Sequence, residues 1–540
     1  MQTADGFRGR RGIGANPPPG IRSKLRRSPA VGGELAAWIF PGVLSTIGFA
    51  FFVLFVFTGE ASKLQCAVAF IVTAVPFSIA ALEDPNRLLH PLSVFGFTLL
   101  LGFACQTVYL THGEPALLSD LLSGLSTDVL TPGILVVSVA VAALAIGYAA
   151  GRTTQVPKPG RLLQRAVALG FAGPSPRRTM WVVLALCAIA IVAFVLYAPK
   201  VGINTPADLF SSRKRYGEVE GGETVFGYYR LGMSLAGVAF ILGVFTMART
   251  RVGWSSELGA AVIVALVLTA SYAIITSSRT ELFATLTVAA FIAIAIRGRE
   301  PRPGTIATVV VVALLGVTFL GGLRAVNQGQ ADTLSSATKT GALVEEAIAG
   351  RAWADIGPLS VLVDRVPEAY PYQYGKTVVS ILWAPVPKSV WPEKPPVRLG
   401  PVISPAVFGF DVDRRTGDPP GLVGELWLNG GVIGVIIGMV AFGALLRRVE
   451  RWHRLAPETG GLTAIPYGVL VVALCLKLPV SDITGVAISI LEDLPLLALL
   501  VWIVRERSPG RPAPWTTGES VGLASPPQGT RLASPPGGGR

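Results

Sequence analysis

Hydrophobic runs alternate with short charged segments along most of the chain. Each run is about 20 residues long, enough for one helix to cross a hydrocarbon core of about 30 Å. The pattern predicts about twelve spans, near residues 37–57, 64–82, 91–110, 131–150, 180–198, 227–247, 256–276, 280–296, 304–323, 426–446, 461–480 and 483–503. The expected fold class is therefore an all-α polytopic membrane protein with about twelve transmembrane helices.

The predicted spans divide the chain into two bundles, two tails and one long connection. These are a basic tail at 1–33, a bundle of about nine spans at 34–323, a loop at 324–425, a bundle of about three spans at 426–503 and a tail at 504–540. Both tails are rich in Pro, Gly and Ser and lack hydrophobic periodicity, which is typical of disordered segments. The loop is far longer than an ordinary connection between packed helices, which indicates a functional element.

Two stretches of the loop are apolar enough to contact the membrane or the bundle. Apolar positions recur at helical spacing between Leu343 and Val363, which predicts an amphipathic helix that lies on the membrane or caps the bundle. The segment 376–391 combines a short apolar stretch with tryptophans and prolines. Because this segment is too short to span, it predicts a re-entrant or interfacial element.

The composition agrees with a membrane protein and argues against other classes. The 540 residues are 51% hydrophobic and 15% charged, whereas soluble domains have about 25% charged residues. The four cysteines all lie inside apolar runs, so neither a disulfide framework nor a zinc site is expected. No phosphate-cradling loop, metal-ligand spacing or dinucleotide fingerprint is present, and we therefore expect no cofactor and no metal.

The net charge of +13 reflects membrane orientation more than a partner. Most of the excess Lys and Arg lies in the two tails and in alternate short loops, which is the distribution expected of the cytoplasmic side. Both termini are therefore expected in the cytoplasm, and the loop 324–425 outside it. The tails offer only Phe7 and Trp515 for base stacking, so nucleic acid is not an expected partner.

Two segments in and after the loop carry a recognisable pattern. They are Tyr374–Gly375, Pro387 and Trp391–Pro392–Glu393–Lys394–Pro395, followed by Gly424–Glu425–Leu426–Trp427–Leu428–Asn429–Gly430. This arrangement resembles the signature region of bacterial oligosaccharide repeat-unit polymerases, the O-antigen polymerase family. The resemblance includes Ser278–Arg279–Thr280 at the start of a span and Gly322–Leu323–Arg324 at the loop entrance. Elsewhere the similarity is one of hydropathy.

The resemblance implies a GT-C-like membrane glycosyltransferase in the bacterial cytoplasmic membrane. Its substrate would be a polyprenyl-diphosphate-linked glycan, polymerised at the outer face by an inverting, metal-independent transfer. Membrane lipid, a chain-length regulator and a flippase would be its partners. A transporter or flippase of lipid-linked oligosaccharide is the alternative from another class. A related O-antigen ligase is disfavoured, since His90, His112 and His453 are not placed in the large outer loop where the ligase base is expected.

Under this hypothesis, arginines at the outer ends of spans would hold the diphosphate, because the guanidinium binds phosphate oxygens bidentately. Arg279 and Arg324 are the leading candidates, since a charge at such a position is costly unless it is paired or functional. The alternative is that each reaches the headgroups, or pairs with a carboxylate such as Glu281. Lys394 and Arg398 would add phosphate or sugar contacts, or simply form a solvated loop face.

The general base would be a carboxylate at the mouth of a span. Glu425 is the leading candidate and Asp418 the second. The alternatives are that Glu425 caps a helix N-terminus and that Asp418 shapes a turn. Tyr374 and Trp391 could stack on sugar rings or belong to an interfacial aromatic belt.

Three further carboxylates, Asp482, Glu492 and Asp493, lie in or beside the last span. A pair with Lys477 would be structural, whereas a proton or ion path would favour a transporter.

Overall fold

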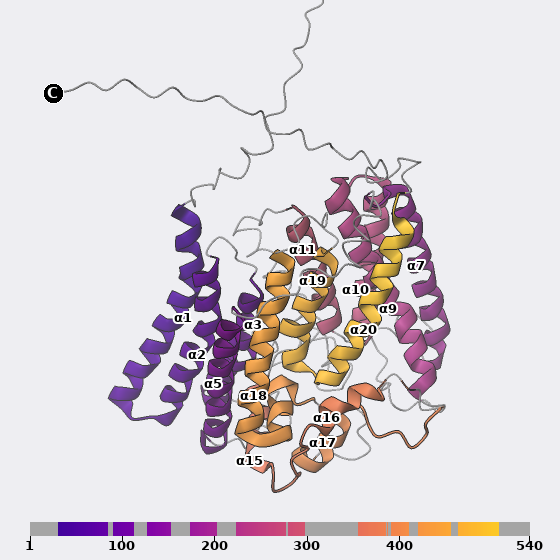
Figure 1. Ribbon diagram of the computed structural model, residues 1–540. Coiled ribbons are helices and arrows are strands. Elements are labelled where there is room, and N and C mark those ends of the chain that lie inside the picture. The colour runs from indigo at the N-terminus through magenta and orange to yellow at the C-terminus, as the bar shows by residue number, and fades with distance from the viewer. Residues whose placement is uncertain are drawn as a thin grey trace, which may run out of the picture.

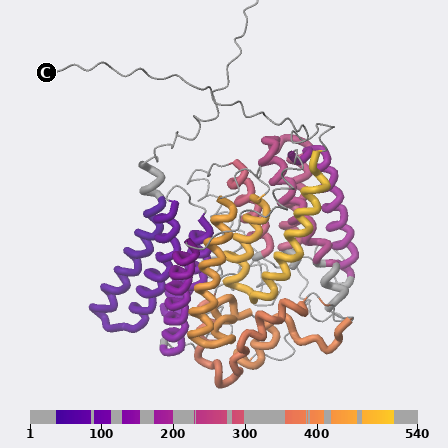
Figure 2. The backbone as a smooth tube through the Cα atoms, in the orientation of Figure 1, coloured from indigo at the N-terminus to yellow at the C-terminus, as the bar shows by residue number. Residues whose placement is uncertain are grey.

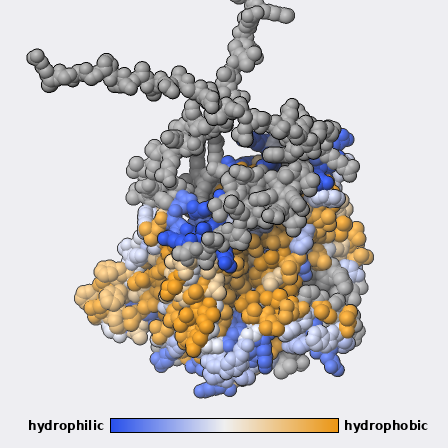
Figure 3. All heavy atoms as spheres, viewed as in Figure 1, coloured by the Kyte–Doolittle hydropathy of each residue, from blue (hydrophilic) through white to orange (hydrophobic). Residues whose placement is uncertain are grey.

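The computed structural model describes residues 31–84, 90–112, 127–152, 173–201, 223–276, 279–297, 355–384, 386, 390–409, 419–454 and 463–506. Helices form the described part of the chain, and its residues contain no strand (Figure 1). On the face shown in Figure 3, apolar side chains form a band across the middle of the bundle, with more polar surface beyond it. This is the surface expected of a protein surrounded by lipid.

The helices follow the predicted order of spans. They are α1 (Val31–Thr58), α2 (Ala61–Glu83), α3 (Pro91–Leu99), η1 (Leu100–Cys105), α4 (Gln106–His112), α5 (Thr127–Ala150), α7 (Pro176–Tyr197), η2 (Ala198–Val201), α9 (Glu223–Thr250), α10 (Glu257–Thr276), α11 (Arg279–Arg297), α15 (Ile356–Arg365), α16 (Lys376–Val379), η3 (Ser380–Leu382), α17 (Gly400–Phe408), α18 (Gly421–Arg454), α19 (Ala464–Val472), η5 (Ala473–Lys477), η6 (Leu478–Val480) and α20 (Ile483–Val504).

Within the described ranges, eight helical stretches are long and apolar enough to cross a membrane, and two shorter apolar stretches accompany them. The prediction of an α-helical multi-pass membrane protein is confirmed. The predicted span at 304–323 lies outside the described residues, so the count of twelve and the GT-C-like architecture stay predictions. The four cysteines are free thiols, three of them buried and Cys105 partly so, in helices, as their apolar surroundings predicted.

The two ends of the bundle carry different parts of the chain. Helix α1 begins and α20 ends at one end, which we call the tail end. Residues 355–409, with α15 to α17, lie across the opposite end, which we call the loop end (Figures 1 and 2). The described part of the predicted loop is therefore placed at one end of the bundle, away from the helix termini that lead into the tails.

Helices α5 and α18 cross in close contact toward the tail end of the bundle. A methyl group on Gly147 would collide with the carbonyl group of Val440, and one on Gly443 with that of Leu144. Small residues allow this approach of two backbones, which is a principal means of helix association in membranes. The crossing fixes the axis of α18, whose two ends carry the polar clusters described below.

Helix α15 caps the bundle at the loop end. Its residues Ile356, Leu359, Leu362 and Val363 are buried, and the helix packs against α5, α17 and α18. The Asp355 side chain caps its N-terminus by accepting a hydrogen bond from the Gly357 amide. The sequence predicted an amphipathic helix that either lies on the membrane or caps the bundle. Its described part, α15, agrees with the capping placement, and residues 343–354 lie outside the described residues.

Candidate functional site

Helix α18 is broken at Gly430 and Gly431, close to the loop end. The Gly431 backbone has φ 58° and ψ −143°, a conformation that favours glycine. A Cβ atom on Gly434 would lie 2.5 Å from the Leu426 carbonyl oxygen. Residues 421–429 therefore form a short half-helix that folds against the longer part of α18. In the segment 376–391, the described residues form the short helices α16 and η3, and a re-entrant or interfacial element there stays a prediction.

The half-helix holds the loop segment that begins the family pattern. The Asn429 side chain accepts a hydrogen bond from the Gly375 amide at 2.7 Å and donates to the Thr377 hydroxyl at 2.7 Å. The Gln373 amide donates to the Leu428 carbonyl group at 2.8 Å. These bonds join two segments that are far apart in the sequence, since 54 positions separate Gly375 from Asn429.

Glu425 lies beneath this contact and is fully buried, with no exposed surface. Its Oε2 atom accepts a hydrogen bond from the Ile483 amide at 2.6 Å, and Thr377 lies beside the same carboxylate. Its Oε1 atom is buried and has no hydrogen-bond partner. Glu425 thus contacts the N-terminus of α20, not that of its own helix, and one carboxylate oxygen remains free to accept a proton or a hydrogen bond.

Asp482 and two hydroxyl groups complete the cluster at the start of α20. Asp482 caps the helix by accepting from the Gly485 amide at 2.5 Å, and it is nearly fully buried beside Glu425. The hydroxyl groups of Ser380 and Thr484 lie 2.7 Å apart, and both donate to the Thr377 carbonyl group. The role of Asp482, which the sequence left open, is therefore that of a helix cap within this cluster.

The aromatic candidates lie at the surface of the loop end. Tyr374 is 79% exposed, has φ 46° and meets the ring of Tyr372 edge to face at 6.2 Å. A positive φ is rare for a bulky residue and requires support from its surroundings. Trp391 is partly exposed. Burial raises the pKa of the nearby Tyr370 hydroxyl, because it disfavours the charged phenolate.

The structure describes the side chains of only some of the cationic candidates. Lys394 donates to the carbonyl groups of Ala384 and Val386 at 2.8 Å each, so its ammonium group holds the loop segment that follows η3. Arg398 is exposed. Arg279 begins α11, but its side chain lies outside the description. Arg324, Asp418 and Pro387 lie outside the described residues.

A second group of charges lies within the bundle. Lys477, at the end of η5, lies 3.7 Å from Glu281, and Asp493 interacts electrostatically with both. The ion pair of Lys477 is thus with Glu281 of α11, and its pairing with an acidic residue of the last span stays a prediction. Glu281, proposed as an alternative partner of Arg279, pairs with Lys477.

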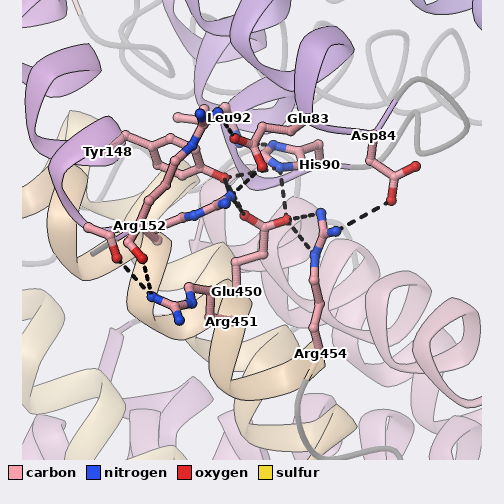
Figure 4. A network of polar contacts seen from close by, with 11 residues as sticks. Glu83, Asp84, His90, Leu92, Tyr148, Arg152, Glu450, Arg451 and Arg454 are labelled. Atoms are coloured by element: carbon pink, nitrogen blue, oxygen red, sulfur yellow. Dashed lines mark hydrogen bonds and ion pairs between the residues drawn. The ribbon is translucent and has the colours of Figure 1, made fainter. Parts of the chain in front are cut away.

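A third polar group lies at the tail end, around the fully buried Glu450 (Figure 4). The Oε1 atom of Glu450 lies 2.9 Å from Nε2 of His90, and Tyr148 donates to its Oε2 atom. The Nδ1 atom of His90 accepts from the Leu92 amide, so its Nε2 atom is the donor toward Glu450. Arg454 donates to the Glu450 Oε1 atom at 2.5 Å.

The same network reaches α2 and α5 through arginine. Arg447 donates to Glu83 at 2.5 Å, Arg152 forms an ion pair with the same carboxylate, and Arg454 lies 3.7 Å from Asp84. Each buried carboxylate therefore has cationic partners, as a stable buried ion network requires. This network ties helices together, whereas the loop-end cluster contains the unpartnered Glu425 oxygen. We therefore take the loop-end cluster as the candidate functional site.

No family model matches this chain, and no curated protein or solved structure matches it. The resemblance to the O-antigen polymerases therefore rests on the residues quoted above.

Sequence reasoning missed the partners of both glutamates. Thr377, Ser380 and Thr484 are ordinary helix-surface residues in sequence, and only the approach of α16 to α20 brings the three together. Glu450 lies among the arginines at the tail end of α18, a pattern that indicated orientation alone. One available signal was Tyr148, a polar aromatic residue near the end of an otherwise apolar run.

Proposed function

We propose that this protein is a membrane glycosyltransferase that polymerises polyprenyl-diphosphate-linked oligosaccharide repeat units. The growing glycan would pass from its lipid diphosphate to a sugar hydroxyl of an incoming lipid-linked unit. The loop end would face outward from the bacterial cytoplasmic membrane, and both tails would lie in the cytoplasm.

One observation carries this proposal: the two segments that resemble the O-antigen polymerases lie in direct contact. Asn429, in the second segment, binds the backbone of Gly375, in the first. The contact surrounds a buried carboxylate with a free oxygen. A pattern that arose by chance would have no reason to assemble its parts around a potential base.

The chemistry assigns different tasks to the candidate residues. Glu425 is the proposed base, because its Oε1 atom is free to accept the proton of the acceptor hydroxyl. Tyr374 presents an exposed ring that suits the apolar face of a sugar. Arg279 and Arg324 are the proposed diphosphate contacts, by family resemblance. Lys394 is a weaker candidate for phosphate binding, because its ammonium group already donates to a carbonyl group of the loop.

A transporter of lipid-linked oligosaccharide is the second candidate function. The observation that favours it is the charged group formed by Glu281, Lys477 and Asp493 within the bundle. Ionisable residues at such depth often mark a substrate or proton path. The contact between Lys477 and Glu281 equally suits an ion pair that holds η5 and α11 together.

Complementation of a deletion strain tests the proposal. Deletion should leave lipid-linked single repeat units and abolish long polymer, and the wild-type gene should restore it. Glu425→Gln and Arg324→Ala should each reduce long polymer by about tenfold or more at native abundance, because each removes a group that acts in the transition state.

Matched controls keep this experiment specific. Glu368→Gln and Arg249→Ala change exposed residues outside the site and should polymerise normally. If deletion also stops single repeat units from reaching the outer face, the transporter is favoured. Normal polymer from every variant would overturn the site assignment.

A further inference from the structure

The turn formed by α16 and η3 has an inverted distribution of polar and apolar side chains. Its hydroxyl residues Thr377 and Ser380 are buried, whereas its apolar residues Val378, Val379 and Leu382 are exposed, Leu382 by 78%. A turn surrounded by water is expected to show the opposite arrangement, with the apolar side chains inside. The inversion indicates that an apolar medium surrounds the outer face of this turn.

The buried hydroxyl groups attach the turn to two helices of the bundle. The Ser380 and Thr484 hydroxyl groups lie 2.7 Å apart, and the Thr377 hydroxyl accepts a hydrogen bond from Asn429 at 2.7 Å. Thr484 is in the first turn of α20, and Asn429 lies just before the break of α18. The polar face of the turn therefore points toward the bundle, and its apolar face points away from it.

The two attachment points also give the depth of the turn in the membrane. Helix α20 is a candidate span of 22 residues, and its length of about 33 Å matches a hydrocarbon core of about 30 Å. Thr484, near its start, therefore lies at the edge of the core. The break of α18 lies at the same level, because Thr377 contacts both Asn429 and Thr484.

The exposed apolar residues continue along the chain to Val390 and Trp391. Val390 is 74% exposed, and Trp391 beside it is partly exposed. Lys394 donates to the Ala384 carbonyl group at 2.8 Å, which holds this second stretch against the end of η3. Single exposed apolar residues are ordinary on soluble proteins, whereas a group of them marks contact with a protein or a membrane.

The neighbouring surface of α18 indicates which of these partners covers the turn. Val432, Ile433, Ile436 and Ile437 are exposed directly after the break, on the part of α18 that crosses the bundle. Lipid surrounds such side chains on a membrane helix. Because the turn is attached to Asn429, its apolar face continues the lipid-facing surface at the loop-end edge.

We propose that the turn of α16 and η3 is a membrane anchor that inserts Val378, Val379 and Leu382 into the leaflet at the loop end. Its partner is the lipid of that leaflet, with acyl chains against the apolar side chains and headgroups against the exposed Lys376. The anchor holds the loop beside the half-helix that carries Glu425, so the candidate site lies at the depth of the headgroups. Of the two elements that the sequence allowed here, this is the interfacial one. The inference rests on the membrane helices and does not depend on the proposed reaction.

Fluorescence in nanodiscs tests the anchor directly. Leu382→Cys, in a full-length chain whose native cysteines are changed to serine, would carry an environment-sensitive dye. The nanodiscs would contain phosphatidylethanolamine and phosphatidylglycerol, without lipid-linked glycan. Dye emission should be blue-shifted, and lipid with a nitroxide near the headgroup end of its acyl chain should quench it about threefold more than in Glu368→Cys. Glu368→Cys is the control for contact with water, and Ile433→Cys is the control for contact with lipid.

A charged variant tests whether the apolar side chains hold the turn in the membrane. Leu382→Asp, with the dye on Val390→Cys, should lower the quenching at position 390 about threefold, because a carboxylate resists transfer from water. Ala369→Asp adds the same charge at another exposed position of the loop end and should leave the quenching unchanged.

Each other occupant of this surface gives a different result. Emission and quenching at Leu382→Cys that match those of Glu368→Cys would show that water covers the turn, and the inference would be wrong. A blue shift without lipid quenching, together with crosslinking between Leu382→Cys chains, would assign the face to a second copy instead. A blue shift that requires added lipid-linked glycan would assign it to the polyprenyl chain and equally reject the anchor. Normal lipid quenching in a protein that makes no polymer would support the anchor and overturn the proposed function alone.

Discussion

At the scale of single residues, the two glycines at the α18 break differ sharply. Gly431 has a positive φ of 58°, and a Cβ atom there would lie 3.0 Å from the Tyr372 hydroxyl. Gly430 has an extended φ of −178° and open space around a Cβ atom. Gly431→Ala should therefore destabilise the protein by about 1–3 kcal/mol, whereas Gly430→Ala should be nearly neutral. Thermal unfolding of the purified variants measures the difference.

Equal unfolding temperatures for the two alanine variants would contradict the described break.

Gly430 and Gly431 also show the limit of sequence reasoning, since the sequence contains two adjacent glycines with nothing to tell them apart. The sequence predicted Glu425 as a site residue from its place at the mouth of a span. It could not predict the partner atoms, because Ile483 lies 58 residues away.

At the scale of elements, the Glu450 network joins α2, α5 and α18 at the tail end. Glu450→Gln removes the buried charge that faces Arg447 and Arg454, and it leaves the largely buried Arg447 with less compensation. Breaking a buried ion pair costs about 3–5 kcal/mol. We expect a loss of this size in unfolding free energy, measured by thermal or denaturant unfolding in detergent.

Glu257→Gln is the matched control, since Glu257 is exposed in the first turn of α10. If both variants unfold alike, the network contributes little to stability.

Hydrophobic periodicity predicted these helices well, because a run of about 20 apolar residues has few alternatives in a membrane. It could not predict which helices share a network, since that depends on packing between distant segments. The break in α18 escaped prediction for the same reason.

At the scale of the whole molecule, the positive-inside pattern predicts that the loop end faces outward. Single cysteines would replace exposed Glu368 at the loop end and exposed Arg249 at the tail end, in a chain whose native cysteines are changed to serine. A membrane-impermeant maleimide should label Glu368→Cys in intact cells, and Arg249→Cys only after permeabilisation. The reverse result would overturn the orientation and, with it, an outer active site.

The contact between the loop and the α18 half-helix relies heavily on main-chain atoms. The amides of Gln373, Gly375 and Ile483 are donors, and the Leu428 carbonyl group is an acceptor. Any residue supplies these atoms, so the contact depends on few side chains, among them Asn429, Thr377 and Glu425, with glycine where the backbone demands it. Lineages that carry this machinery are thus free to drift until little sequence similarity remains. Relatives of this chain should be sought by the spacing of those few residues and by shape.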